Sequence, residues 1–533
     1  MASYDSELHS IPEPEKINTP WSCAIPPASR HSITSHFQGW QALLVKLIIT
    51  ISGLDPTLHT CFVFPRLQVA QACQTYITRP DRPDGLEALE PSTTSIRAFE
   101  STGTGLHMFA VTFPVDKLVH VMAWWSDTGM AVSSRFAEAV LADTKGLHEV
   151  ALDAPPAHPS EVGPAHEVVR KRIARLMERA PITSRERTVQ PSDVYLFQSG
   201  MAAIYNLHQW LHGLRGGKSA IFGALFYETK HVVDKYGGGL EFFPGGVELD
   251  DLERFLEAER AEGRAVVSVW TEIPSNPLLV TPDLTRLRRL ADEHGFVLVV
   301  DDTVGGVCNV DVLPVADVVI TSLTKLFSGH ADVMAGSAVL NPSSTKYSAL
   351  KAEFERRYVN DLFAEDAKAL RHNSEDYLHR AAVANRNAMV LTDWLHKRAK
   401  LGGSSIKHVL YPTTTPTGTQ GNFEVLKRPA TADFTPGHGC LFTIEFHSQD
   451  AAVSFYDNLH VYQGPHLGAH RTIALPYAYL IYGPGDQEKL RRMGMTTAQI
   501  RISVGYEDER TLLDTFKYAV LKADAAERAK WAV

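Results

Sequence analysis

From about residue 165 onward, short apolar runs alternate with stretches in which apolar residues recur at helical spacing. The runs predict β-strands at residues 194–197, 220–222, 266–270, 296–300 and 318–320. The helical spacing predicts amphipathic helices at residues 201–214, from residue 249 to near Gly263, and from residue 284 to Gly295. Strands that alternate with helices are typical of an α/β fold with a mostly parallel sheet covered on both faces.

Polar residues stand at the carboxyl ends of four of these predicted strands. They are the segments 198–200, 271–272, 301–302 and 321–322. In open α/β sheets, ligands bind at the edge where the strands end. We therefore expect one ligand site built from these four strand ends.

The two ends of the chain differ from this middle part in composition and in the pattern of apolar residues. Residues 1 to about 35 are rich in Pro and Ser without periodicity, which predicts a loosely packed arm. A Pro/Thr/Gly-rich stretch at 411–439 is followed by a predicted strand at 440–446 and a predicted helix at 451–459. The sequence thus predicts three parts: an amino-terminal extension and arm (1–164), a large domain (165–395) and a smaller α+β domain (396–533).

Composition excludes several classes of function. The chain has 533 residues, 44% of them apolar, and a net charge of −9, so no basic excess is available for nucleic acid. Its five cysteines are scattered, which predicts neither a disulfide framework nor a metal site and fits a reducing cytoplasm. The first residues resemble no signal peptide. The apolar run 42–54 contains Lys46 and is too short to span a membrane, so it predicts a buried helix or strand.

The segment 322–336, SLTKLFSGHADVMAG, carries the strongest chemical signal. It begins where the last predicted strand of the series ends. The amine of Lys325 can react with an aldehyde cofactor, and the hydroxyls of Ser322 and Thr324 on the same turn can donate hydrogen bonds to a phosphate. A lysine after a strand is more often a solvated surface residue. The neighbouring residues favour the cofactor.

The pattern Ser-x-Thr-Lys followed by Gly-His-x-Asp-Val-x-x-Gly resembles the lysine signature of the Cys/Met-metabolism enzymes that use pyridoxal 5'-phosphate (PLP). This family includes cystathionine γ-synthase, the cystathionine lyases, methionine γ-lyase and O-acylhomoserine sulfhydrylase. The resemblance runs from about residue 165 to 525. The first 160 or so residues are most similar to the fungal cystathionine γ-synthase branch. The resemblance to the family implies PLP as cofactor and PLP fold type I, the aspartate aminotransferase-like fold.

Several cofactor-binding residues follow from this resemblance. Ser199, Gly200 and Met201 lie at a strand-to-helix junction, where free backbone N–H groups and the helix dipole suit a phosphate, although the same residues could form a plain helix cap. Asp301 matches the acid that keeps the ring nitrogen of PLP protonated. Asn276 corresponds to the residue that bonds the ring hydroxyl oxygen, while an Asn before Pro is also a common turn residue.

Other positions match the family or depart from it. Arg501 matches the arginine that binds the substrate α-carboxylate, for which its forked guanidinium is suited. Either Phe226 or Tyr227 could stack on the cofactor ring, and only Tyr227 carries a hydroxyl for catalysis. The segment that reaches a partner's phosphate is absent, and Arg135 is the proposed substitute. His466 stands where the family has a serine in the substrate loop.

The resemblance implies a homo-oligomeric, PLP-dependent transferase that acts on amino acids. We expect γ-replacement on an O-acylhomoserine by a thiol such as cysteine, with Lys325 moving the protons. A lyase, a sulfhydrylase or an enzyme with a carbon nucleophile stays open. A family member that has lost catalysis is disfavoured because Lys325, Asp301 and Arg501 are retained.

Overall fold

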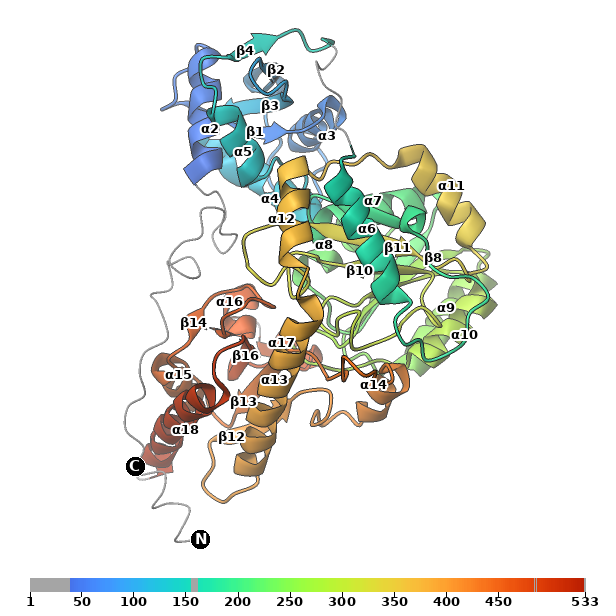
Figure 1. The fold of residues 1–533 in the computed structure, drawn as a ribbon, viewed down its shortest axis with the longest axis vertical. Coiled ribbons are helices and arrows are strands. Elements are labelled where there is room, and N and C mark those ends of the chain that lie inside the picture. Colours follow the sequence, from blue (N-terminus) through green and yellow to red (C-terminus); the bar gives the residue numbers. More distant parts are fainter. Residues whose placement is uncertain (1–38, 155–161, 484, 486, 532–533) are drawn as a thin grey trace.

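A computed structural model describes residues 39–154, 162–483, 485 and 487–531. The arm expected at residues 1–35 lies outside these ranges. In the described residues, three β-sheets follow one another along the chain, and each is covered by helices (Figure 1).

The amino-terminal sheet has four antiparallel strands in the order β1-β3-β2-β4. Its elements are α2 (Gly39–Ile51), β1 (His59–Phe64), α3 (Leu67–Thr78), β2 (Ser95–Ser101), β3 (His107–Pro114), α4 (Leu118–Thr128), α5 (Ser134–Leu141) and β4 (Leu147–Val150). The apolar run 42–54 forms most of α2, which buries Leu44, Ile48 and Ile49 against this sheet. Residues 39–150 are hereafter called the amino-terminal unit.

The central sheet has seven strands in the order β5-β11-β10-β9-β8-β6-β7, in which β11 runs in the direction opposite to the other six. The strands are β5 (Val194–Phe197), β6 (Lys218–Phe222), β7 (Leu240–Phe243), β8 (Val266–Glu272), β9 (Val297–Asp301), β10 (Val318–Thr321) and β11 (Gly336–Leu340). The helices are α6 (Pro164–Met177), α7 (Gly200–Leu214), α8 (Tyr227–Lys235), α9 (Leu249–Ala261), α10 (Leu284–His294), α11 (Tyr347–Arg357) and α12 (Ala364–Asn373). The mostly parallel α/β sheet expected from the sequence is confirmed.

The carboxyl-terminal sheet has five strands in the order β12-β13-β16-β15-β14. Its strands are β12 (Ile406–Leu410), β13 (Leu441–Phe446), β14 (Tyr462–Gln463), β15 (Ile473–Leu475) and β16 (Gln499–Ser503). The helices around it are α13 (Tyr377–Ala399), α14 (Gln420–Leu426), α15 (Gln449–Asn458), α16 (Tyr477–Tyr482), α17 (Gln487–Arg492) and α18 (Glu509–Trp531). The long helix α13 leads from the central sheet into this part of the chain (Figure 1).

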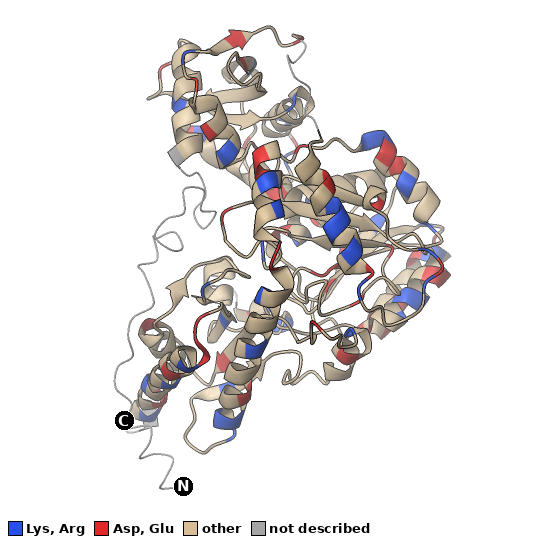
Figure 2. Ribbon diagram, in the orientation of Figure 1, with Lys and Arg blue, Asp and Glu red and all other residues tan. Residues whose placement is uncertain are grey.

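Buried side chains join these parts. One apolar core runs from Phe62, Phe64 and Trp124 of the amino-terminal unit to Ile204 and Leu207 of α7. Charged residues of both signs lie along the outer helices, whereas the central strands carry few (Figure 2). Among the described helices, none combines the length and apolar character needed to cross a membrane. The domain boundaries at residues 164 and 395 stay a prediction.

Candidate active site

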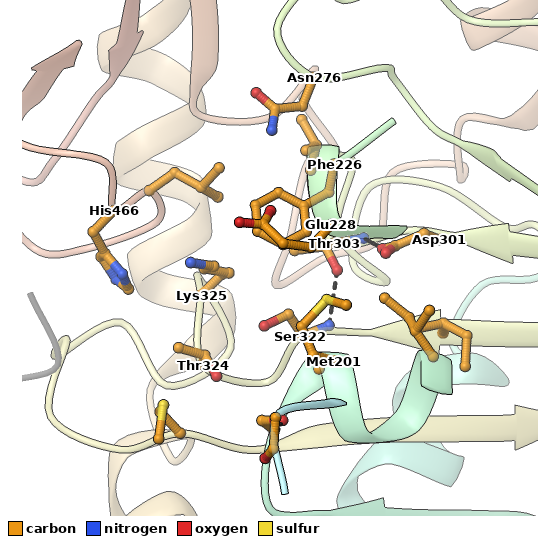
Figure 3. A pocket seen from close by; sticks show the side chains of 18 of the residues that line it. Met201, Phe226, Glu228, Asn276, Asp301, Thr303, Ser322, Thr324, Lys325 and His466 are labelled. Carbon is orange, nitrogen blue, oxygen red and sulfur yellow. Dashed lines mark hydrogen bonds between the residues drawn. The ribbon is translucent and has the colours of Figure 1, made fainter. Parts of the chain in front are cut away.

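A pocket opens at the carboxyl ends of the central strands (Figure 3). Residues from the ends of all four predicted strands line it: Ser199 after β5, Glu272 of β8, Asp301 of β9 and Ser322 after β10. Glu272 and Asp301 lie side by side because β8 and β9 pair in parallel register. The expected site at this edge is therefore present as a single cavity.

The turn between β5 and α7 leaves backbone donors free. Ser199 caps α7: its Oγ accepts a hydrogen bond from the Ala202 N–H at 2.9 Å and donates one to the Gly129 carbonyl at 3.0 Å. The first helical N–H groups, those of Gly200 and Met201, have no acceptor within their own helix. The hydroxyl of Ser199 is thus used within the protein, and the backbone of the two following residues can hold an anion.

The two hydroxyls of the lysine turn differ. Thr324 lines the pocket, but its Oγ1 donates to the Ala335 carbonyl and accepts from the Ala335 N–H, both at 3.0 Å. Ser322 also lines the pocket, and its backbone N–H donates to Thr303 Oγ1 at 2.8 Å. No hydrogen bond from Ser322 Oγ to another described residue is present. Ser322 therefore retains a free hydroxyl donor, whereas Thr324 does not.

Lys325 extends into the middle of the pocket (Figure 3). Among the described residues, no hydrogen bond or ion pair holds its amine. Burial, together with the nearby charge of Arg501, lowers the pKa of Lys325 to about 8, while Glu228 opposes this shift. About a tenth of the amine is therefore uncharged at pH 7, far more than for an ordinary lysine, and only this form can act as a nucleophile or a base.

The two carboxyl groups at the ends of β8 and β9 are held in different states. Burial raises the pKa of Glu272 well above its usual value, and the neighbouring Asp301 adds to this effect. Burial also raises the pKa of Asp301, but only to about 6, because Thr303 donates hydrogen bonds to it. Burial therefore favours the protonated form of Glu272, whereas Asp301 is mostly a carboxylate near neutral pH and can receive a cationic N–H group.

Arg501 of β16 enters the pocket from the carboxyl-terminal sheet. Its guanidinium donates to Asn276 Oδ1 at 3.2 Å and to the Pro465 carbonyl at 2.6 Å, and it lies over the ring of Tyr477. Burial lowers the pKa of Arg501 to about 10, so the side chain keeps its charge at neutral pH. Its remaining N–H donors are available for a carboxylate.

The structure separates the two candidate aromatic residues. Phe226 lines the pocket and is 37% exposed. The ring of Tyr227 does not line it and instead contacts His231 and Tyr482, with ring centroids 4.1 and 5.4 Å apart. Phe226 is thus the ring that can stack on a cofactor, and Tyr227 is not positioned for the catalytic role expected from its hydroxyl.

His466 lies in the pocket on the side of Lys325 opposite Glu228 (Figure 3). It is buried, its Nε2 has no hydrogen-bond partner among the described residues, and burial lowers its pKa well below the usual value. Its loop is fixed by Gly468, whose φ of +73° allows the backbone to pass the Lys325–Leu326 turn so closely that a Cβ would lie 2.4 Å from the Leu326 nitrogen. The histidine is therefore held in place as a neutral ring.

Arg135 does not line the pocket. Its guanidinium donates to the backbone carbonyl of Asp332 at 2.6 Å and forms ion pairs with the carboxylates of Asp332 and Asp366. These contacts lie within one chain, so the side chain is already paired and is not placed as a free phosphate ligand.

Two groups of lining residues were not predicted from the sequence. Glu228, at the start of α8, points toward Lys325, and burial raises its pKa (Figure 3). It is two residues from Phe226, but an acid in the first turn of a helix is ordinary. Trp125, Ser126 and Gly129 come from the amino-terminal unit, and no local motif points to their contact with residues about 70 positions away.

The pocket meets the chemical needs of PLP. The free N–H groups of α7 and the hydroxyl of Ser322 suit the phosphate, Asp301 suits the ring nitrogen, Phe226 suits the ring face and the amine of Lys325 suits the aldehyde. Over the ranges that the structure describes, no group of three or more His, Cys, Asp or Glu side chains is arranged to hold a metal ion.

This fold and pocket define a PLP-binding protein of fold type I. The sequence profile described as "Cys/Met metabolism PLP-dependent enzyme" matches residues 163–521, so the chain belongs to this family. Residues 41–133 match the profile of the "fungal trans-sulfuration enzyme, N-terminal domain". The expected family, fold and cofactor are confirmed.

Known relatives carry different activities in their names. The chain is 33% identical to the cystathionine gamma-synthase-like enzyme iboG1 of Amanita muscaria, over 91% of this chain and 90% of the relative. It is 36% identical to alanine racemase ungC of Aspergillus violaceofuscus, over 76% and 72%. It is 33% identical to cystathionine gamma-synthase of Neurospora crassa, over 68% and 60%. These relatives support a PLP enzyme but leave the reaction open.

Solved structures agree on the fold. Cystathionine gamma-lyase from Lactobacillus plantarum superposes with a TM-score of 0.54 at 20% identity, over 71% of this chain and 95% of that one. Methionine gamma-lyase CalE6 from Micromonospora echinospora gives 0.52 at 23% identity, over 68% and 87%.

The substitution Asp301→Asn tests the assignment of the charged carboxyl group. An amide cannot stabilise a protonated ring nitrogen, so we expect the variant to retain some PLP but to lose most of its turnover, by about 100-fold or more. Steady-state rates and the PLP content of the purified protein are the measurements. Asp234→Asn, an exposed position on α8 away from the pocket, is the control. A near-normal rate for Asp301→Asn would show that another carboxyl group has this role.

Proposed function

We propose that the protein catalyses γ-replacement on an O-acylhomoserine by a thiol such as cysteine. The observation that carries this proposal is the amine of Lys325, which has no hydrogen-bond or ion-pair partner among the described residues and is partly uncharged in a pocket that also contains Arg501 and Asp301. One amine in this position can move protons at both Cα and Cβ of a bound amino acid, as γ-chemistry requires.

Arg501 orients the substrate in this proposal. Its guanidinium binds the α-carboxylate by parallel hydrogen bonds, and the bonds to Asn276 and Pro465 fix its direction. Asn276 keeps its amide nitrogen as a donor, since only its Oδ1 accepts from Arg501. These contacts would place the substrate Cα within reach of Lys325.

PLP, when bound, supplies an electron sink for the carbanion at the substrate Cα. Lys325 Nζ accepts the Cα proton, because a pKa near 8 leaves a useful fraction of the amine neutral. In the overall reaction the Cγ–O bond breaks, the acyl group leaves as a carboxylate, and the thiol sulfur bonds to Cγ. The thiol proton is released to a base.

Two side chains beside Lys325, His466 and Glu228, suit the nucleophile. The neutral ring of His466 can accept the thiol proton at Nε2, which has no partner among the described residues. The carboxyl group of Glu228 lies on the other side of Lys325 from His466 (Figure 3). It can accept hydrogen bonds from the ammonium group of cysteine. An acid and a neutral imidazole on either side of the amine favour an aminothiol over inorganic sulfide.

Two further features belong to the proposal, and two other functions compete with it. We expect a homo-oligomer, dimeric or tetrameric, and a cytoplasmic location. A lyase of the same family uses the same lysine, aspartate and arginine, so it is the main competing function. A subunit without catalysis is disfavoured by the retention of all three.

Product analysis separates these functions. The holoenzyme is incubated with O-acetylhomoserine or O-succinylhomoserine, each with and without cysteine. We expect a thioether as the main product with cysteine, and slower formation of 2-oxobutyrate and ammonia without it. If only oxoacid and ammonia form whatever thiol is present, the lyase function replaces the transferase.

The variant His466→Ser tests the nucleophile side of the pocket. We expect at least about a fivefold change in the ratio of thioether to 2-oxobutyrate, with PLP binding unchanged, because His466 does not contact the phosphate turn. His470→Ser, in the same loop but outside the pocket lining, is the control. The proposed role is excluded if both variants keep the wild-type ratio.

In the same assay, Glu228→Gln should slow the reaction with cysteine more than the reaction with 2-mercaptoethanol, which lacks an ammonium group.

A further inference from the structure

The end of α4 in the amino-terminal unit forms one wall of the pocket. Trp125, Ser126 and Gly129 line the cavity together with the central sheet residues Ser199 and Met201. The segment that follows, residues 129–135, then passes from the β5–α7 turn to the lysine loop. This segment contacts the site at two points.

The first contact is between Gly129 and the turn that precedes α7. Gly129 ends α4 with a φ of +62°, and its carbonyl accepts the hydrogen bond from Ser199 Oγ at 3.0 Å. A Cβ at this position would lie 2.1 Å from Ser199 Oγ and 2.9 Å from the Cβ of Met201. The two backbones are therefore packed as closely as a glycine permits.

The second contact is between Arg135 and the loop that follows Lys325. Arg135 donates to the Asp332 carbonyl at 2.6 Å and to its carboxylate at 3.1 Å. It also pairs with Asp366 of α12, which is 2% exposed. The loop that carries Lys325 and the turn that precedes α7 are thus both attached to the same seven-residue segment.

The amino-terminal unit is itself firmly attached to the central sheet. Asp127 is buried and bonds Lys235 at 2.9 Å and the hydroxyl of Tyr236 at 3.2 Å, both at the end of α8. Trp124, 1% exposed, belongs to the apolar core that includes Ile204 of α7. The segment 129–135 therefore cannot shift without disturbing a buried ion pair and a packed core.

We propose that residues 129–135 are a positioning segment for the PLP site, in which Gly129 sets the turn that binds the phosphate and Arg135 holds the lysine loop. The amino-terminal unit is then part of the cofactor site within one chain. This inference concerns cofactor binding and does not depend on which reaction the enzyme catalyses.

The variant Gly129→Ala tests the proposal. It should displace Ser199 and Met201 and weaken the dissociation constant for PLP at least about tenfold, measured by titrating the apoenzyme with PLP. Gly53→Ala and Gly85→Ala are matched controls, because both glycines lie in the same unit with φ of +67° and +73° and have nothing within 4 Å of a new Cβ. These controls carry the same backbone strain and should change the dissociation constant less than about twofold.

Two further measurements distinguish positioning from general stability. The visible circular dichroism of bound PLP should change in Gly129→Ala but not in the controls, since it reports the orientation of the cofactor. In addition, Ser199→Gly should restore part of the lost affinity in the Gly129→Ala background, because it removes the oxygen that the new Cβ meets, while glycine is nearly as good a helix cap as serine. If Gly129→Ala binds PLP like the controls, the proposal is wrong.

If Gly129→Ala does not fold, the wild-type protein provides the test. Because binding and local stability are linked, PLP should slow amide hydrogen exchange in residues 125–132 as well as in 199–203. The peptide containing β4, an edge strand of the amino-terminal sheet, should exchange equally with and without PLP. An exchange rate in residues 125–132 that does not respond to PLP would overturn the proposal.

Discussion

The structure depends on keeping the amine of Lys325 inside the protein and partly uncharged. Burial provides this condition, because it disfavours the charged ammonium form, and the positive charge of Arg501 adds to it. The same burial raises the pKa of the carboxyl groups in the pocket and so favours their neutral form. Thr303 limits this effect for Asp301 by donating hydrogen bonds, whereas the pKa of Glu272 is raised well above its usual value. The pocket thus holds a partly uncharged amine and one charged carboxylate.

Three separate parts of the chain meet at this amine. The central sheet supplies the lysine, the acid and the turn before α7, the carboxyl-terminal sheet supplies Arg501, and the loop before β15 supplies His466. The amino-terminal unit completes the wall through the end of α4. Apolar cores hold these parts, and one core is shared between the amino-terminal unit and α7, so little ordering of the site remains to be done when a ligand binds.

Much of the central sheet could be predicted from the sequence. The strand at 194–197 agrees with β5 to the residue, and the helix that begins at 284 ends at Gly295, which has the left-handed conformation typical of a helix end. A strand buried on both faces gives a continuous apolar run, which is easily recognised. Strand β11 was not predicted, because its place between β5 and β10 is set by long-range antiparallel pairing and not by a local pattern.

The candidate site, too, could be predicted only where a local sequence motif marks its residues. Lys325, Asp301 and Arg501 lie in motifs and converge as expected. The choice between Phe226 and Tyr227 could not be made from adjacent positions, since the backbone just before α8 decides which ring faces the pocket. Glu228 and Gly129 act through contacts that no local motif carries. Arg135 was expected to reach a partner's phosphate, but its ion pairs with Asp332 and Asp366, which became visible only in three dimensions, hold it within the chain.

The most direct test of this account is to locate the cofactor on the chain. The purified holoenzyme is treated with sodium borohydride, which reduces the bond between PLP and a lysine to a stable amine, and its peptides are analysed by mass spectrometry. We predict a single phosphopyridoxyl group on the peptide that contains Lys325. A label on a different lysine, or no covalent label in a protein that retains PLP, would contradict the account.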